Sequence, residues 1–144
     1  MRGILGAALV VMALCTALPA VAGPFEDADA AAHRKDYATA LRLMKPLAEQ
    51  GNPLAQSRLA YLYERGQGAP QDYAEAVKWY RKAAEQGDAL AQTSLGALFE
   101  RGQGVPQDYV EAMKWYRLAA EQGEPTAQNN LGAMYRDGRG VPQD

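Results

Sequence analysis

Apolar residues recur along the chain at spacings of three and four, in stretches separated by loops that contain glycine. Residues 36–50 carry six such positions: Tyr37, Ala40, Leu41, Met44, Leu47 and Ala48. This spacing places the six side chains on one broad face of a helix. The same pattern predicts further helices at 24–34, 53–64, 72–86, 89–100, 108–122 and 125–136. The sequence therefore predicts an all-α protein.

The predicted helices recur with a period of 36 residues. An aspartate, whose carboxylate can accept the free N–H groups of a first turn, stands before each long helix or at its expected start: Asp36, Asp72, Asp108 and Asp144. Fixed self-similarity of this length is typical of helix pairs that stack on their neighbours. We therefore expect an α/α superhelical solenoid of antiparallel helix pairs, with units at 36–71, 72–107 and 108–143.

The two ends of the array differ from its middle. Residues 23–35 lack the repeated pattern and predict a capping helix, as terminal units of solenoids often do. At the other end, Asp144 is the expected cap of a long helix that does not follow in this sequence. Three apolar residues of the last short helix would then lack a covering helix: Leu131, Met134 and Tyr135. We expect either self-association through this exposed end or a chain that is part of a longer array.

The first 22 residues have the pattern of a secretory signal peptide. Arg2 is followed by an apolar run from Ile4 to Leu18, and Ala20-Val21-Ala22 offers the small residues of a cleavage site before Gly23. The run is shorter than the roughly 20 apolar residues that span a bilayer, which makes an uncleaved anchor the weaker alternative. We expect cleavage after Ala22, a periplasmic or secreted protein, and membrane contact only during export.

The charge pattern argues against nucleic-acid binding, and the cysteine content argues against disulfides and cysteine-ligated metals. The chain has 15 Lys and Arg against 17 Asp and Glu, for a formal charge of −2, and no basic cluster of the kind that nucleic-acid binding requires. The single cysteine, Cys15, lies in the predicted signal peptide. The mature chain is therefore expected to contain no disulfide and no cysteine-ligated metal.

Several motifs recur in register along the second and third copies. They are Ala91-Gln92, Leu95-Gly96, Gly102-x-Gly104-Val105-Pro106, Trp115-Tyr116 and Ala119-Ala120-Glu121-Gln122-Gly123. Together they resemble the Sel1-like repeat, a 36-residue relative of the tetratricopeptide repeat. The first copy departs from it, with Ala69 in the loop and no Trp-Tyr pair. The resemblance implies an α/α superhelix that acts as an adaptor for protein complexes, often in bacterial envelopes and signalling.

No constellation of residues predicts catalysis. His33 is the only histidine and has no second histidine or cysteine with which to bind a metal. Ser57 and Ser94 are predicted on helices, and neither is followed by the lysine of a Ser-x-x-Lys motif. The glycine-rich loops follow helices and lack the lysine of a phosphate-binding loop, so we interpret them as turns. We expect no enzymatic activity, no cofactor and no metal.

Aromatic and cationic residues that recur on the long helices are the candidate partner-binding residues, because such residues dominate interface hot spots. They are Lys78, Trp79, Arg81, Lys114, Trp115 and Arg117. Their helical spacing favours a second interpretation, in which the two tryptophans pack between the repeats.

Two functions from different classes fit the sequence. The first is a non-catalytic protein–protein interaction module, an adaptor or scaffold that binds another protein or a peptide segment, in the bacterial periplasm or outside the cell. The alternative is an envelope-associated binding protein or enzyme that acts on cell wall or exopolysaccharide. A pocket with convergent carboxylates would favour the alternative.

Overall fold

A computed structural model describes residues 22–141, which form seven α-helices and no strand. The helices are α1 (Pro24–His33), α2 (Tyr37–Glu49), α3 (Pro53–Arg65), α4 (Tyr73–Glu85), α5 (Ala89–Arg101), α6 (Tyr109–Glu121) and α7 (Pro125–Arg136). Each begins and ends within one residue of its prediction, which confirms the all-α fold class. The predicted signal peptide, apart from Ala22, and Asp144 lie outside the described residues.

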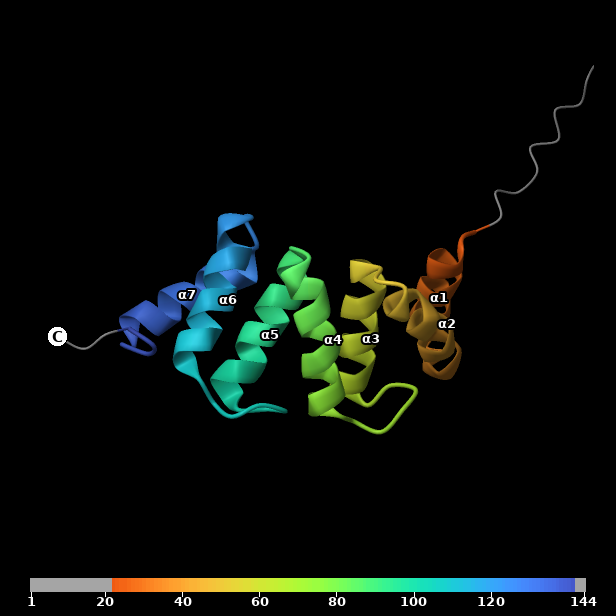
Figure 1. Ribbon diagram of the computed structural model, residues 1–144, viewed down its shortest axis with the longest axis horizontal. Helices are drawn as coiled ribbons and strands as arrows, with labels where there is room; N and C mark the ends of the chain where they lie inside the picture. The colour runs from red at the N-terminus through yellow and green to blue at the C-terminus, as the bar shows by residue number, and fades with distance from the viewer. Residues whose placement is uncertain (1–21, 142–144) are drawn as a thin grey trace, which may run out of the picture.

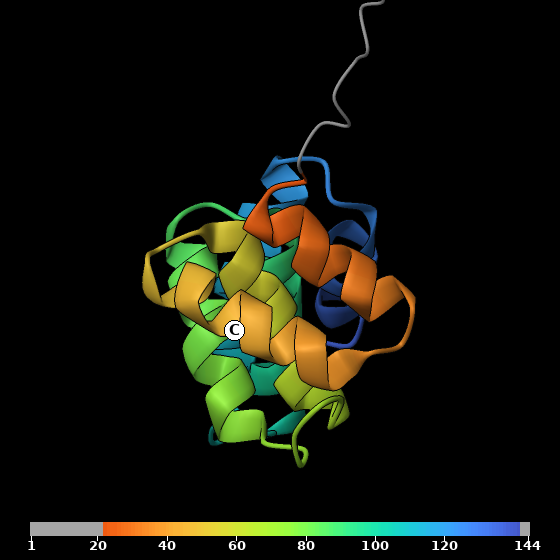
Figure 2. The same ribbon diagram turned by 90° about the vertical axis from the view of Figure 1, so that its right-hand side faces the viewer.

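The helices follow one another in chain order along the long axis of the molecule (Figure 1), and Figure 2 shows the stack from its α1 and α2 end. Each helix packs mainly against the helix before it and the helix after it. This is the packing of an α-solenoid, as predicted. None of the helices in this part of the chain is long and apolar enough to cross a membrane.

Tyrosines of the long helices fix the pairing of helices within the stack. The most extensive packing is between α3 and α4 and between α5 and α6. The hydroxyl of Tyr80 on α4 donates to Glu64 Oε2 on α3 at 2.7 Å, and that of Tyr116 on α6 donates to Glu100 Oε2 on α5 at 2.8 Å. The packing unit is therefore a short helix with the long helix that follows it. The 36-residue period agrees with the prediction, but these units begin one helix later than the boundaries drawn from the aspartates.

Side-chain caps begin the long helices. The carboxylates of Asp36 and Asp72 accept hydrogen bonds from the backbone N–H groups of Thr39 and Glu75, and Asp108 caps α6 in the same way. A cap of this kind stabilises a helix by about 1 kcal/mol. The aspartate signal in the sequence therefore located the helix starts correctly.

Paired glutamines tie successive turns of the solenoid together. Gln56 is buried, donates to the Ala48 carbonyl at 3.0 Å, and accepts from Gln86 Nε2 at 2.7 Å. Gln92 and Gln122 repeat the arrangement in the next unit. Because a buried amide destabilises the fold unless it is hydrogen-bonded, these contacts fix the position of each short helix relative to the long helices on both sides.

The close approach of α5 to α6 generates a prediction with a matched control. A β-carbon at Gly96 would lie 2.8 Å from two ring atoms of the buried Tyr116, whereas one at Gly132, the equivalent position on α7, would meet no atom within 4 Å. We expect Gly96→Leu to lower the free energy of unfolding by about 1–3 kcal/mol through overpacking. Gly132→Leu should raise it slightly, because leucine favours a helix by up to about 1 kcal/mol over glycine. Urea titrations followed by circular dichroism measure both, and an equal effect of the two substitutions would contradict this packing.

Candidate partner-binding site

The four predicted cationic residues lie on α4 and α6, where three of them are exposed and Arg81 is half-buried. Lys114 and Arg117 line one surface hollow of about 470 Å³, together with Val110, Met113, Gly140 and Val141. Lys78 and Arg81 belong to the preceding unit. The structure thus brings together the two cations of α6 and leaves those of α4 apart from them.

The two tryptophans are buried, as the helical spacing favours, so they do not belong among the candidate partner-binding residues. Trp79 is 4% exposed and Trp115 is 6% exposed. The ammonium groups of Lys78 and Lys82 lie 5.1 Å and 4.7 Å from the centre of the Trp79 ring, and Lys114 lies 5.3 Å from that of Trp115. The rings therefore pack between helices, and lysines of the same helix lie over their faces.

The C-terminal end is less open than the sequence predicts. Met134 is 1% exposed and Leu131 is partly buried, while Tyr135 is 51% exposed. Position 134 corresponds to Leu62 and Leu98, which are also buried, so its side chain faces the core in every unit. Of the three residues expected to form an exposed end, Met134 is a core residue and Tyr135 is the exposed one.

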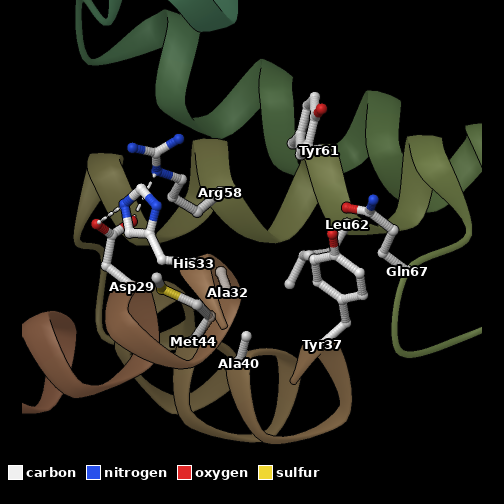
Figure 3. A pocket seen from close by; sticks show the side chains of 10 residues that line it. All are labelled: Asp29, Ala32, His33, Tyr37, Ala40, Met44, Arg58, Tyr61, Leu62 and Gln67. Carbon is white, nitrogen blue, oxygen red and sulfur yellow. Dashed lines mark ion pairs between the residues drawn. The ribbon is translucent and has the colours of Figure 1, made fainter. Parts of the chain in front are cut away.

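A pocket between the first three helices was not predicted. It has a volume of about 300 Å³, and we call it the α1–α3 pocket (Figure 3); its lining is Asp29, Ala32, His33, Tyr37, Ala40, Met44, Arg58, Tyr61, Leu62 and Gln67. The carboxylate of Asp29 lies 3.2 Å from His33 Nε2 and 3.3 Å from Arg58 Nε. The pocket therefore has a charged end and, on the opposite side, the two tyrosine rings and Gln67.

A second hollow adjoins this pocket across α3. It measures about 370 Å³, and we call it the α3–α5 hollow; its lining is Phe25, Leu54, Ser57, Arg58, Tyr61, Tyr80, Asp88, Leu90 and Ser94. Arg58 and Tyr61 line both cavities. Leu54 and Leu90 are 56% and 64% exposed, although both are large apolar side chains. We refer to the pocket and the hollow together as the short-helix groove, because the short helix α3 lines both cavities and the short helix α5 lines the second.

The sequence did contain a signal for this groove. Leu54 and Leu90 occupy equivalent repeat positions, and Arg58 and Tyr61 stand where the next unit has Ser94 and Ala97. Sequence reasoning weighed the residues that recur and gave no weight to those that depart from the repeat. Arg58 and Tyr61, which line both cavities, are two of these departures.

The hydroxyl of Tyr80 lies at the inner wall of the α3–α5 hollow. Burial raises the pKa of Tyr80 well above its ordinary value, and the neighbouring Glu64 carboxylate raises it further. Burial and the hydrogen bond to Glu100 raise the pKa of Tyr116 in the same direction. Both phenols are therefore neutral hydrogen-bond donors across the physiological pH range.

The groove does not assemble a catalytic triad in the described part of the chain. His33 pairs with Asp29, but its side chain is 78% exposed. In residues 22–141 no hydrogen bond joins His33 to Ser57 or Ser94, and no group of three or more His, Cys, Asp or Glu side chains is placed to hold a metal ion. The arrangement that is present suits binding by apolar contact and hydrogen bonding.

Comparison with protein families identifies the repeat. The family model described as the Sel1 repeat matches residues 31–52, 53–88, 89–124 and 125–144. The chain belongs to the Sel1 repeat family. The matched units 53–88 and 89–124 coincide with the helix pairs that the buried tyrosines define, so the family and the packing give the same unit boundaries.

Solved structures of Sel1 repeat proteins resemble this chain. A protective antigen present in uropathogenic Escherichia coli strains is 48% identical with a TM-score of 0.72, over 73% of this chain and 22% of the antigen. A Sel1 repeat protein from Oxalobacter formigenes is 38% identical with a TM-score of 0.77, over 82% of this chain and 49% of the other. Cysteine rich protein B of Helicobacter pylori shares the fold at 20% identity, with a TM-score of 0.61, over 74% of this chain and 96% of the other. The chain thus spans half or less of the first two relatives.

No curated protein matches the chain. Sel1 repeats typically mediate protein–protein interactions, and the fold is a scaffold for such contacts.

The two buried tyrosines generate a pH prediction. In the unfolded chain tyrosine ionises near pH 10, whereas in the fold the pKa values of Tyr80 and Tyr116 are raised. Their contribution to stability is complete below about pH 10 and is lost as the pH rises above it, because the unfolded state then releases protons that the fold retains. We expect the free energy of unfolding from urea titrations to fall between about pH 9 and 11.

The double variant Tyr80→Phe, Tyr116→Phe should show a smaller fall over the same range. Tyr135→Phe, at an exposed position on α7, is the matched control and should fall as the wild type does. An unchanged slope in the double variant would show that other groups cause the alkaline loss.

Proposed function

We propose that this Sel1 repeat protein is an exported, non-catalytic adaptor that holds a segment of another protein in its short-helix groove. The observation that carries the proposal is the pair of adjoining cavities across α3, whose outer edge bears the exposed Leu54 and Leu90. Exposed apolar side chains gathered around a concavity are typical of a protein-binding surface.

An extended peptide segment suits the shape of this groove. Alternate side chains of an extended chain point to the same side, so a segment that crosses Arg58 and Tyr61 can place side chains in both cavities. The hydroxyls of Ser57 and Ser94 in the α3–α5 hollow can pair with the backbone of the segment. Apolar contact would then supply affinity, and these hydrogen bonds would fix the register.

The cations of the long helices have a secondary role in this proposal. Lys78, Arg81, Lys114 and Arg117 could attract acidic groups of the same partner, since surface charges chiefly raise the rate of association. Their tryptophan neighbours Trp79 and Trp115 are buried and take no part. The partner is therefore expected to contact the groove directly, and the cations are expected to assist its approach.

Export is the second part of the proposal. It is supported by the charged, apolar and small-residue order of residues 1–22, which is that of a signal peptide cleaved after Ala22. The adaptor would act in the periplasm or outside the cell.

Site-specific photo-crosslinking in an envelope extract tests the adaptor proposal. A crosslinking amino acid at Leu90 samples the groove, one at Arg117 samples the long-helix cations, and one at the exposed Glu85 is the control. We expect one protein to crosslink from Leu90 and not from Glu85, and the crosslink to be lost when Leu54→Asp adds a charge to the apolar wall.

Three other outcomes would change the proposal. A crosslink from Arg117 alone would move the site to the long helices. Self-crosslinks that map to Tyr135 would indicate self-association through the C-terminal end. Retention of cell-wall fragments or exopolysaccharide, with no protein crosslinked, would support the glycan-binding alternative.

A further inference from the structure

We propose that the α1–α3 pocket binds a tyrosine side chain of the partner protein and thereby sets the sequence preference of the groove. The inference rests on the proposed function in one respect, that the partner is a protein segment lying in the short-helix groove.

The later repeat units show which side chain can occupy the place of Met44, beside the α1–α3 pocket. Position 44 corresponds to Tyr80 and Tyr116 in the next two units, one and two periods of 36 residues later. Both tyrosines are buried, with their hydroxyls bonded to a glutamate of the preceding short helix. The first unit has Met44 instead, an unbranched side chain without a ring, and the α1–α3 pocket lies directly against it. At this position the first unit therefore lines its pocket with a methionine, where the other two units carry a phenol.

The walls of the pocket suit an aromatic ring. Met44, Ala40 and Leu62 are 1%, 0% and 3% exposed and form an apolar floor, while Tyr37 and Tyr61 stand on one side (Figure 3). Aromatic rings pack edge to face or offset against one another, and a methionine sulfur makes a favourable contact with a ring edge. Each of these contacts favours an aromatic guest over an aliphatic one of similar size.

The charged end of the pocket suits the hydroxyl. One oxygen of Asp29 already contacts His33 and the other contacts Arg58, and each keeps a lone pair that can accept a further hydrogen bond. A carboxylate is also what accepts the hydroxyls of Tyr80 and Tyr116. Position 58 corresponds to Ser94 and Asn130, polar residues that lower the pKa values of Tyr80 and Tyr116, although burial raises them more. The first unit therefore keeps polar partners for a phenol that its own sequence lacks.

The mouth of the pocket opens toward the rest of the groove. Tyr61 is 41% exposed and, with Arg58, borders both the pocket and the α3–α5 hollow. A partner segment can therefore insert its tyrosine on one side of this border while a neighbouring apolar side chain meets Leu54 and Leu90. The tyrosine would then be the residue that aligns the segment in the groove.

The test uses three short probes on the isotope-labelled protein, followed by amide chemical shifts. The probes are blocked Gly-Ser-Tyr-Ser-Gly, Gly-Ser-Phe-Ser-Gly and Gly-Ser-Leu-Ser-Gly peptides. We expect the tyrosine peptide to shift the amides of Ala32, Ala40 and Leu62 with saturation. It should bind about tenfold more tightly than the other two, because a hydrogen bond to a charged group contributes about 1.5–3 kcal/mol. Equal binding of the three peptides, or shifts confined to other helices, would overturn the proposal.

Two variants distinguish the contribution of the guest tyrosine's ring to binding from that of its hydroxyl. Met44→Tyr fills the pocket with the ring that the other units carry, and should abolish the shifts while the circular dichroism spectrum is retained. Asp29→Asn keeps the pocket and removes the charged acceptor, and should lower the preference for tyrosine over phenylalanine to about twofold or less. Glu85→Gln, at an exposed position outside the groove, should bind the tyrosine peptide as the wild type does. If Met44→Tyr fails to fold, Asp29→Asn alone decides, and a preference unchanged in that variant would overturn the proposal.

The tyrosine pocket and the adaptor proposal can fail independently, and the two experiments distinguish these cases. If the partner crosslinks from Leu90 equally in wild type and Met44→Tyr, the adaptor proposal stands and the tyrosine pocket is wrong. If the tyrosine peptide binds as expected but no protein crosslinks from Leu90, the pocket stands and the adaptor proposal is wrong.

Discussion

The stacking of this solenoid depends on one buried contact, the tyrosine of a long helix pressed against a small residue of the short helix before it. Tyr116 lies so close to Gly96 that a β-carbon there would meet its ring at 2.8 Å, and its hydroxyl reaches Glu100 one turn further along the same short helix. A hydroxyl in the core must be hydrogen-bonded. The ring therefore fixes the distance between the two helices, and the glutamate fixes their register.

The two parts of the groove differ in this contact: the α3–α5 hollow lies beside Tyr80, whereas the α1–α3 pocket lies in the first unit, which has Met44 in place of the tyrosine. With Met44 in place of the tyrosine, α1 and α2 pack through small side chains such as Ala28 and Ala40, and the space between α1 and α3 is left open. The floor of this space is buried and closely packed. A preformed pocket of this kind loses little conformational freedom when it is filled, which favours binding.

Local signals in the sequence predicted the helices, because aspartate caps and apolar spacing act within a few residues. The unit boundaries were not predictable in this way, since a tandem array has the same period wherever counting begins and only the packing of Tyr116 on Gly96 distinguishes the pairs. The burial of Trp79 was favoured but not decided by the spacing, because the ring lies at the edge of the apolar stripe. The α1–α3 pocket was missed because its wall joins Asp29 to Arg58, and their contact exists only in the folded chain.

The two candidate surfaces, the long-helix cations and the short-helix groove, differ in the contacts that their side chains already make within the chain. Lys78 and Lys82 lie over the Trp79 ring, and Arg81 lies 5.5 Å from the centre of the Phe99 ring, so each cation of α4 has an aromatic neighbour within its own chain. A partner would have to replace those contacts. Leu54 and Leu90 are more than half exposed, and water is what a partner would displace from them. Since burial of apolar surface contributes about 25 cal/mol per Å², the groove is where binding yields the larger gain in free energy, and the cations chiefly steer the approach.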